Sequence, residues 1–310
     1  MYGQHPIADV SRFLRAVVTN QVAYLSPQFY VKWVGETGRG SQEESVEQAV
    51  NYFKTCFFDY FDILGINKDC IESYLLGKRI LEYGPGDLPG VGLLMLAYGA
   101  ESVICVDRFS LCSFSSKNIE ILKNILDDLP NKMRLRAESC FVEHGNVTAG
   151  FDDQRLRYLV HPFGLSGLKQ VADLIISRAV LEHVNDLTAT FADMFHALRH
   201  GGMAVHEVDL SSHGLHRQNP LDFLTWPQCL WTWMYSHKGC VNRWRVDRYR
   251  EAIRENGMEV VMMKPLRVIE KHVVEEVRPY LPPLFHHISD EELTWLTFRF
   301  ICRKIEPTRV

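Results

Sequence analysis

Large apolar side chains recur every three or four positions in the first part of the chain, most clearly within residues 41–64. Such spacing places them along one face of a helix. The members of this apolar stripe are Val46, Val50, Phe53, Phe57 and Phe61. We therefore expect residues 1–76 to form a mostly helical cover over an apolar surface.

Beyond Lys78 the pattern changes to short apolar runs that alternate with helical segments. This alternation predicts an α/β fold, in which right-handed crossovers place helices on both faces of a mostly parallel sheet. A helix over residues 187–198 is expected to end at Gly201 and Gly202. Five runs are typical of buried strands, namely residues 79–83, 102–107, 156–160, 173–177 and 203–210.

The last third of the chain contains a looser stretch and then returns to regular patterns. Residues 211–250 are rich in histidine, tryptophan and proline, which is typical of a lid or a substrate-side insertion. Residues 248–257 predict a helix, and residues 259–265 and 297–304 predict strands, the last of which closes an antiparallel edge of the sheet. This order favours one α/β domain over residues 77–310, preceded by the helical cover.

Composition and charge narrow the class of protein. The chain has 34 basic and 38 acidic residues and a net charge of −4, which argues against general binding of nucleic acid or of an anionic membrane. The longest strongly apolar stretch, residues 90–100, is about half of the ~20 residues that span a bilayer. The first residues show no secretory signal, and the eight cysteines form no CxxC pair. We expect a cytoplasmic globular protein.

A glycine-rich turn joins the first predicted strand to the next helix. Gly84, Pro85 and Gly86 allow close approach of a ligand to the backbone, but Pro89 stands where the dinucleotide fingerprint requires a third glycine. Glu82 lies two positions before this loop. A carboxylate there would repel a pyrophosphate and attract an ammonium or sulfonium group. The cofactor indicated is cationic rather than NAD.

Asp107 ends the second predicted strand, 21 positions beyond Gly86. An acid at this place can accept hydrogen bonds from both ribose hydroxyls of an adenosine-containing ligand. Adenosine together with a cationic tail indicates S-adenosylmethionine. The alternative is a strand-to-helix turn with incidental glycines and a solvated carboxylate.

With these motifs the chain resembles the class I S-adenosylmethionine-dependent methyltransferases, and the separate segment 206–213 resembles a small-molecule subset of them that acts on sugars or natural products. The resemblance spans about residues 78–210 and is carried by residues 81–86, 106–107, 173–184 and 198–202 in that order. It implies a Rossmann-like, doubly wound sheet of seven strands with an antiparallel last strand. It also implies that Asp107 holds the ribose. The cofactor-binding residues carried over are Glu82, Gly84, Pro85, Gly86, Asp107, Arg108, Ser177 and Arg178, with Tyr158 as a further candidate beside the adenine.

Histidines and acids cluster where the fourth and fifth strands are expected to end. His183, His206, Asp209 and His213 are the catalytic candidates, because histidine suits a general base near neutral pH. His206 and Glu207 alternate on a strand, so they point to opposite faces. The alternative is a divalent metal held by His206, Asp209 and His213. No metal ligand is assigned from the sequence.

Positive charge gathers in residues 242–250 of this otherwise acidic chain. Asn242, Arg243 and Arg245 are the candidate substrate-binding residues, because guanidinium groups grip a phosphate or carboxylate. The alternative is a solvated helix start, with arginines paired to Asp247 and Glu251.

We therefore expect an S-adenosylmethionine-dependent methyltransferase that methylates an oxygen of a sugar or secondary metabolite with a histidine general base. The acceptor is expected to be a small molecule, acidic or sugar-linked, with no nucleic-acid or membrane partner. The alternatives are N- or C-methylation of a small metabolite, or a non-catalytic S-adenosylmethionine-binding protein. The sequence leaves the oligomeric state open.

Overall fold

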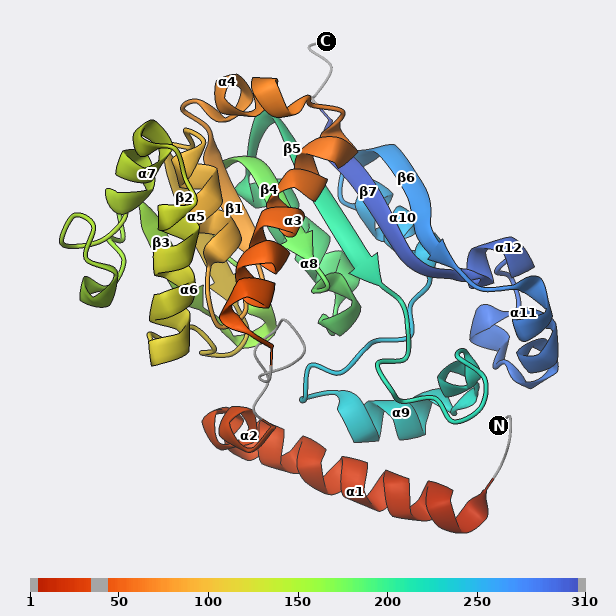
Figure 1. Ribbon diagram of the computed structural model, residues 1–310. Helices are drawn as coiled ribbons and strands as arrows, with labels where there is room; N and C mark the ends of the chain where they lie inside the picture. The colour runs from red at the N-terminus through yellow and green to blue at the C-terminus, as the bar shows by residue number, and fades with distance from the viewer. Residues whose placement is uncertain (1–4, 35–43, 306–310) are drawn as a thin grey trace.

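The computed structural model of the chain describes residues 5–34 and 44–305. Its centre is a seven-stranded sheet in the order β3-β2-β1-β4-β5-β7-β6 (Figure 1). The strands are β1 Arg79–Tyr83, β2 Ser102–Asp107, β3 Leu156–Val160, β4 Ala172–Arg178, β5 Leu198–Asp209, β6 Met258–Val268 and β7 Trp295–Lys304.

The first five strands pair in parallel, and β7 runs antiparallel to both of its neighbours. The expected α/β fold and seven-stranded sheet are therefore confirmed. The expected place of the last strand is wrong, because β7 lies between β5 and β6 and the edge belongs to β6. Burial explains this order, since Phe298 and Phe300 of β7 are fully buried whereas Val261 and Leu266 of β6 are about half exposed.

Helices cover one face of the sheet with the apolar stripe predicted from the sequence. Phe53, Phe57 and Phe61 are all buried in this layer. The first helix of the layer begins later than expected, because the Ser45 side chain accepts a hydrogen bond from the Gln48 backbone and caps it. Residues 41–43 of the predicted helix lie outside the described residues. The layer contains α3 Val46–Leu64, α5 Gly90–Ala97, α6 Ser116–Asp127 and α7 Asn131–Glu138.

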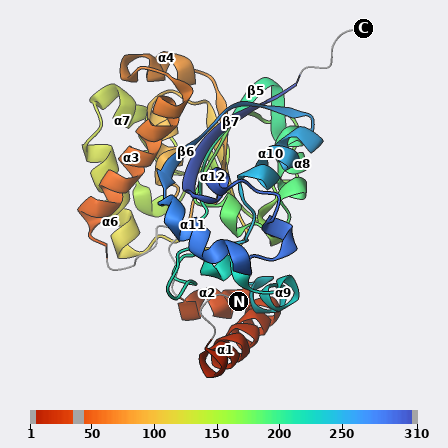
Figure 2. The ribbon, with the colours of Figure 1, turned by 90° about the vertical axis from the view of Figure 1, so that its right-hand side faces the viewer.

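The opposite face carries α8 Leu187–Ala197 and α10 Val246–Glu255, as Figure 2 shows. The expected end of the first of these helices is wrong, because α8 stops at Ala197 and β5 begins at once. Gly202 lies inside β5, where an added Cβ would approach the Leu198 side chain to 2.9 Å. Gly201 and Gly202 therefore lie in the irregular first part of β5 and do not cap a helix.

A third group of helices lies beyond the carboxyl ends of the parallel strands (Figure 1). Asn20 donates a hydrogen bond to the Trp233 carbonyl, and Lys238 donates to the Ala16 carbonyl, so the N-terminal helices contact the predicted insertion. Of the predicted cover, α3 packs on the sheet. The helices concerned are α1 Pro6–Leu25, α2 Pro27–Val34, α9 Gln228–Tyr235, α11 Lys271–Val277 and α12 Asp290–Leu293.

The remaining regular segments are short. The α4 helix spans Ile71–Leu75. Single 3-10 turns lie at Lys68–Cys70, Val147–Ala149, Pro162–Gly164, Leu181–His183, Asp222–Thr225, Arg278–Tyr280 and Pro283–Phe285. Among the described residues, no helix combines the length and the apolar character that a membrane crossing requires.

Candidate functional site

A pocket opens at the carboxyl ends of β1, β2 and β4, and with its open mouth it holds about 880 Å³ of space. The order of the strands reverses at this point. β2 and β3 lie on one side of β1, and β4 lies on its other side. Ligands of open α/β sheets bind at such a point. Its lining includes Tyr83, Gly84, Gly86, Asp107, Arg108, Phe109, Leu111, Phe163, Gly164, Ala179, Val180, His183, Lys238 and Gly239.

The loop after β1 can adopt its path only with glycine. Gly84 and Gly86 have φ values of +66° and +74°, which side chains rarely tolerate. A Cβ on Gly84 would lie 2.3 Å from Cγ2 of Val180, in the loop after β4. The predicted glycine turn therefore brings the two loops into direct contact and forms one wall of the pocket.

Asp107 ends β2 inside this pocket and is 9% exposed. Its Oδ1 accepts hydrogen bonds from the backbone N–H groups of Arg108, at 2.6 Å, and Phe109, at 3.2 Å. Burial nevertheless raises the pKa of Asp107 to about 6. A buried carboxylate in this setting gains from a ligand that offers further hydroxyl donors.

Glu82 lies on the other side of the glycine loop, in a smaller pocket that Pro85 and Arg178 also line. The Cys105 thiol donates to Glu82 Oε2 at 3.6 Å. Burial raises the pKa of Glu82 to about 7. Gly84 borders both pockets, so Glu82 and Asp107 face one loop from its two sides.

The two cofactor candidates at the end of β4 have different surroundings. Arg178 lines the smaller pocket and pairs with Asp59 of α3, at 2.6 Å, and with Glu207 of β5, at 3.1 Å. Ser177 is fully buried, and its hydroxyl is bonded to His206. The prediction that Ser177 binds cofactor is therefore corrected, because its side chain points into the core.

The two residues predicted to lie beside the adenine, Arg108 and Tyr158, also have different surroundings. Arg108 lines the large pocket and donates to the His237 carbonyl at 3.2 Å. Tyr158 instead donates to the Phe109 carbonyl at 3.0 Å and supports the loop after β2 from behind. Sequence reasoning missed Phe163, whose left-handed φ of +73° has no signature in the residue type.

Three of the predicted catalytic residues meet next to the pocket. His183 lines it, and its ring centroid lies 5.1 Å from that of His213. His213 Nε2 lies 3.6 Å from Asp209 Oδ2. Glu182, which the sequence analysis did not select, joins them, because its Oε1 accepts the Asp209 N–H at 3.2 Å. These four residues form the acid–histidine cluster.

Burial changes the proton affinities within the acid–histidine cluster. Burial, reinforced by His213, lowers the pKa of His183 to about 4, which makes it a weak proton acceptor at neutral pH. Burial also raises the pKa of Glu182 well above its usual value. For Asp209, burial would raise the pKa, but hydrogen bonds from His213 and Ser211 hold it well below the ordinary range.

His206 does not belong to this cluster. The ring is fully buried, lies 4.9 Å from the Phe300 ring, and is bonded through Nδ1 to the Ser177 hydroxyl at 2.6 Å. The expectation that His206 acts as a base is therefore wrong. The metal alternative of His206 with Asp209 and His213 fails for the same reason, because His206 and Asp209 point to opposite faces of β5.

The predicted substrate-binding residues hold the insertion in place, and two of them, Asn242 and Arg243, also line a second pocket. Asn242 donates to the carbonyls of Leu181, at 2.9 Å, and Val184, at 3.2 Å. Arg243 is buried and donates to the Leu224 and Trp226 carbonyls. Arg245 is 1% exposed and donates to the Leu210 and Trp295 carbonyls. The guanidinium groups that would bind an acidic acceptor therefore already donate hydrogen bonds to backbone carbonyls.

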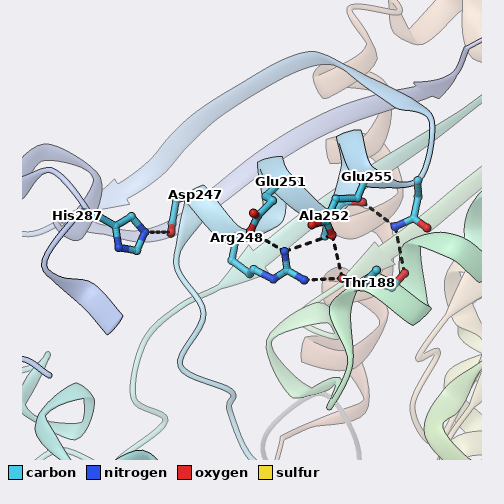
Figure 3. A network of polar contacts seen from close by, with 8 residues as sticks. Thr188, Asp247, Arg248, Glu251, Ala252, Glu255 and His287 are labelled. Carbon is cyan, nitrogen blue, oxygen red and sulfur yellow. Dashed lines mark hydrogen bonds and ion pairs between the residues drawn. The ribbon is translucent and has the colours of Figure 1, made fainter. Parts of the chain in front are cut away.

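The rest of the arginine run lies on the surface. Arg248 pairs with Glu251 at 2.6 Å and Glu255 at 3.3 Å, and Asp247 pairs with His287 (Figure 3). For Arg248 the alternative interpretation is therefore correct, because this residue pairs with acids at a solvated helix start.

A second pocket adjoins the first and shares Val184 with it. Trp231, Tyr235 and Trp244 contribute aromatic side chains to its wall, and Asn185 and Arg243 contribute polar groups. The insertion supplies most of this lining, which agrees with its predicted place beside the site.

A family model described as a methyltransferase domain matches residues 68–262. The chain belongs to this methyltransferase family. The expected enzyme class and the cofactor S-adenosylmethionine are thereby confirmed. A search of curated proteins found no match.

Solved structures similar to this methyltransferase include an S-adenosylmethionine-dependent methyltransferase from Mesorhizobium loti. The two sequences are 20% identical, the match covers 74% of this chain and 92% of the Mesorhizobium chain, and the TM-score is 0.41. Another is the geranyl diphosphate C-methyltransferase from Streptomyces coelicolor A3(2), at 12% identity, 87% and 88% coverage and a TM-score of 0.47.

Proposed function

We propose that this methyltransferase transfers the methyl group of S-adenosylmethionine to a hydroxyl oxygen of a small molecule. One observation carries the proposal. The pocket that contains Asp107, the expected ribose ligand, is bordered by His183 of the acid–histidine cluster. A cofactor held at Asp107 would therefore present its reacting end near groups that can activate a hydroxyl.

The two pockets beside the glycine loop suit the two ends of the cofactor. Asp107 would accept the ribose hydroxyls, and Phe109 and Phe163 would enclose the adenine. The zwitterionic amino-acid part fits the smaller pocket, where Glu82 can meet the ammonium and Arg178 the carboxylate. The presence of Glu82 and Arg178, which differ in the sign of their charge, in the lining of one small pocket supports the assignment.

The acceptor would enter through the second pocket. Flat aromatic side chains, here Trp231 and Trp244, suit the faces of sugars or unsaturated rings. The buried arginines favour a neutral acceptor over an acidic one, because Arg243 and Arg245 already donate to backbone carbonyls. We therefore propose a neutral, ring-containing hydroxyl compound.

In the reaction, the acceptor oxygen forms a bond to the methyl carbon while the carbon–sulfur bond breaks and its electron pair stays on sulfur. The hydroxyl proton must leave the oxygen, and the acid–histidine cluster borders the cofactor pocket through His183. The cluster can act by direct proton acceptance, as the sequence predicts, or by coordinating the oxygen through a cation. The lowered pKa of His183 weakens the first route.

Two measurements test the proposal. Calorimetry should show S-adenosylmethionine binding that weakens at least tenfold in Asp107→Ala and stays unchanged in Asp127→Ala, a surface aspartate paired with Arg134. Unchanged affinity in Asp107→Ala would refute the cofactor site. Incubation with methyl-labelled cofactor and a metabolite extract should yield a labelled methyl ether. A labelled amine or a carbon–methyl product would overturn oxygen as the acceptor atom.

A further inference from the structure

Glu182, His183 and His213 each present one ligand atom, and these atoms all lie within 4.8 Å of one another. Two neighbouring residues in a 3-10 turn after β4 supply the first two, and the loop after β5 supplies the third. Divalent cations bind imidazole nitrogen and carboxylate oxygen at about 2.0–2.2 Å. Small rotations of the partly exposed His213 would bring the three atoms to that distance from one point.

Two polar atoms at this place are buried without a hydrogen-bond partner among the described residues. They are Oε2 of Glu182 and Nδ1 of His183. Glu182 is only 1% exposed, so water does not solvate its free oxygen. Buried polar atoms are normally paired. Two unpaired acceptors in adjacent side chains indicate a missing positively charged partner.

The other atoms of these side chains are held as metal ligands usually are. Glu182 Oε1 accepts the Asp209 N–H at 3.2 Å, which leaves Oε2 as its free oxygen. His183 Nδ1 is buried and has no hydrogen-bond partner among the described residues. His213 Nε2 faces Asp209 Oδ2 at 3.6 Å. A carboxylate behind a ligating histidine orients the ring.

The backbone at His213 is strained, and its ring lies beside that of His183. His213 has a φ of +47° and Gly214 a φ of +77°. Left-handed conformations are costly for histidine, and they persist where the surroundings impose them.

We infer that Glu182, His183 and His213 bind one divalent transition-metal cation of the Zn²⁺ or Mn²⁺ class. Two imidazoles and one carboxylate suit such ions better than Ca²⁺ or Mg²⁺, which prefer oxygen ligands. Because His183 borders the large pocket, a cation bound here would lie beside the proposed cofactor site. Provided that the proposed O-methylation holds, the cation binds the acceptor hydroxyl, lowers its pKa, and lets its proton pass to water.

The test is calorimetric titration of chelator-treated protein with Zn²⁺ and with Mn²⁺. One cation should bind per chain. Glu182→Gln and His213→Asn should each weaken that binding at least tenfold, and asparagine suits the left-handed backbone at this position. His287→Ala is the matched control, because His287 pairs with Asp247 at the surface. Thermal melting confirms that each variant is folded.

No binding by the unmodified protein, or equal binding by the folded His213→Asn variant, would overturn the inference. Titration of S-adenosylmethionine into the chelator-treated protein separates this result from the proposed function. Cofactor binding without cation binding refutes the metal site alone. Cation binding without labelled methyl ether refutes O-methylation while the site itself stands.

Discussion

Gly84 and Val180 are in such close contact that a Cβ on Gly84 would lie 2.3 Å from the valine Cγ2. This contact joins the loops after β1 and β4 across the pocket. Gly84→Ala must therefore open the wall and strain a backbone with a φ of +66°. We expect cofactor affinity to fall at least tenfold and stability to fall by about 1–3 kcal/mol, measured by calorimetry and urea unfolding.

Gly150→Ala separates strain from the contact. Gly150 has a φ of +83°, but an added Cβ there would meet nothing within 4 Å. That variant should lose stability and keep its cofactor affinity. Equal loss of affinity in both variants would show that the Gly84 contact has no special part in binding.

The protonation of Glu82 should make the stability of the cofactor-free protein depend on pH. An unfolded glutamate loses its proton near pH 4.5, whereas burial raises the pKa of native Glu82 to about 7. Between these values the unfolded state binds fewer protons, so the free energy of unfolding falls as pH rises, by at most about 1.4 kcal/mol per pH unit. Urea unfolding at pH 5 and pH 7.5 measures the slope.

Glu82→Gln should reduce that slope, since glutamine does not titrate. Binding of S-adenosylmethionine should show the opposite trend and strengthen as pH rises through 6 to 7, where Asp107 and Glu82 become ionised. Binding that is independent of pH over this range would count against both carboxylates as cofactor ligands.

Asn242 should act as a positioning residue for the turn that contains His183. Its side chain donates to the carbonyls of Leu181 and Val184, on either side of that turn. Asn242→Ala should lower kcat about tenfold, because each hydrogen bond contributes about 1 kcal/mol, and leave cofactor affinity nearly unchanged. Asn256→Ala is the control, since Asn256 donates to the Thr188 carbonyl of α8 and the Ala252 carbonyl of α10. Similar kcat values in the two variants would contradict a positioning role.

His206 and His213 should respond differently to truncation. His206→Ala removes a fully buried ring and leaves a cavity beside Phe300, so we expect a stability loss of about 2–4 kcal/mol. The folded fraction should keep its kcat within about threefold. His213→Ala should lower kcat at least a hundredfold with little effect on stability. A methyl-transfer assay together with thermal melts distinguishes these outcomes, and the reverse ranking would restore His206 to the site.

The positions of the strands along the chain, the glycine loop and the acid at the end of β2 could be predicted because each depends on local sequence. A run such as residues 102–107 is apolar enough for a buried strand whatever surrounds it. Gly84 and Gly86 belong to a turn for which few other residues are suited. The third strand, which has the weakest pattern, spans the expected Leu156–Val160.

Side-chain directions and long-range partners could not be predicted in this way. Asn242, Arg243 and Arg245 have the composition of a ligand site, yet their donors are used by carbonyls that lie up to 61 positions away in the chain. Glu182 is a polar residue at the same strand end as His183, but it is absent from the catalytic residues predicted from the sequence. Nothing in its local sequence shows that one of its oxygens would be buried without a partner.

The sequence by itself determined the class of fold, the family and the cofactor, because these depend on short segments with their own periodicity and turn chemistry. Only the tertiary structure decided which histidines can act together. His206 and His213 lie in one chain segment, but alternation along β5 places the first against Phe300, and the turn after β5 returns the second to His183. Packing between distant elements, which local residue patterns do not encode, made that choice.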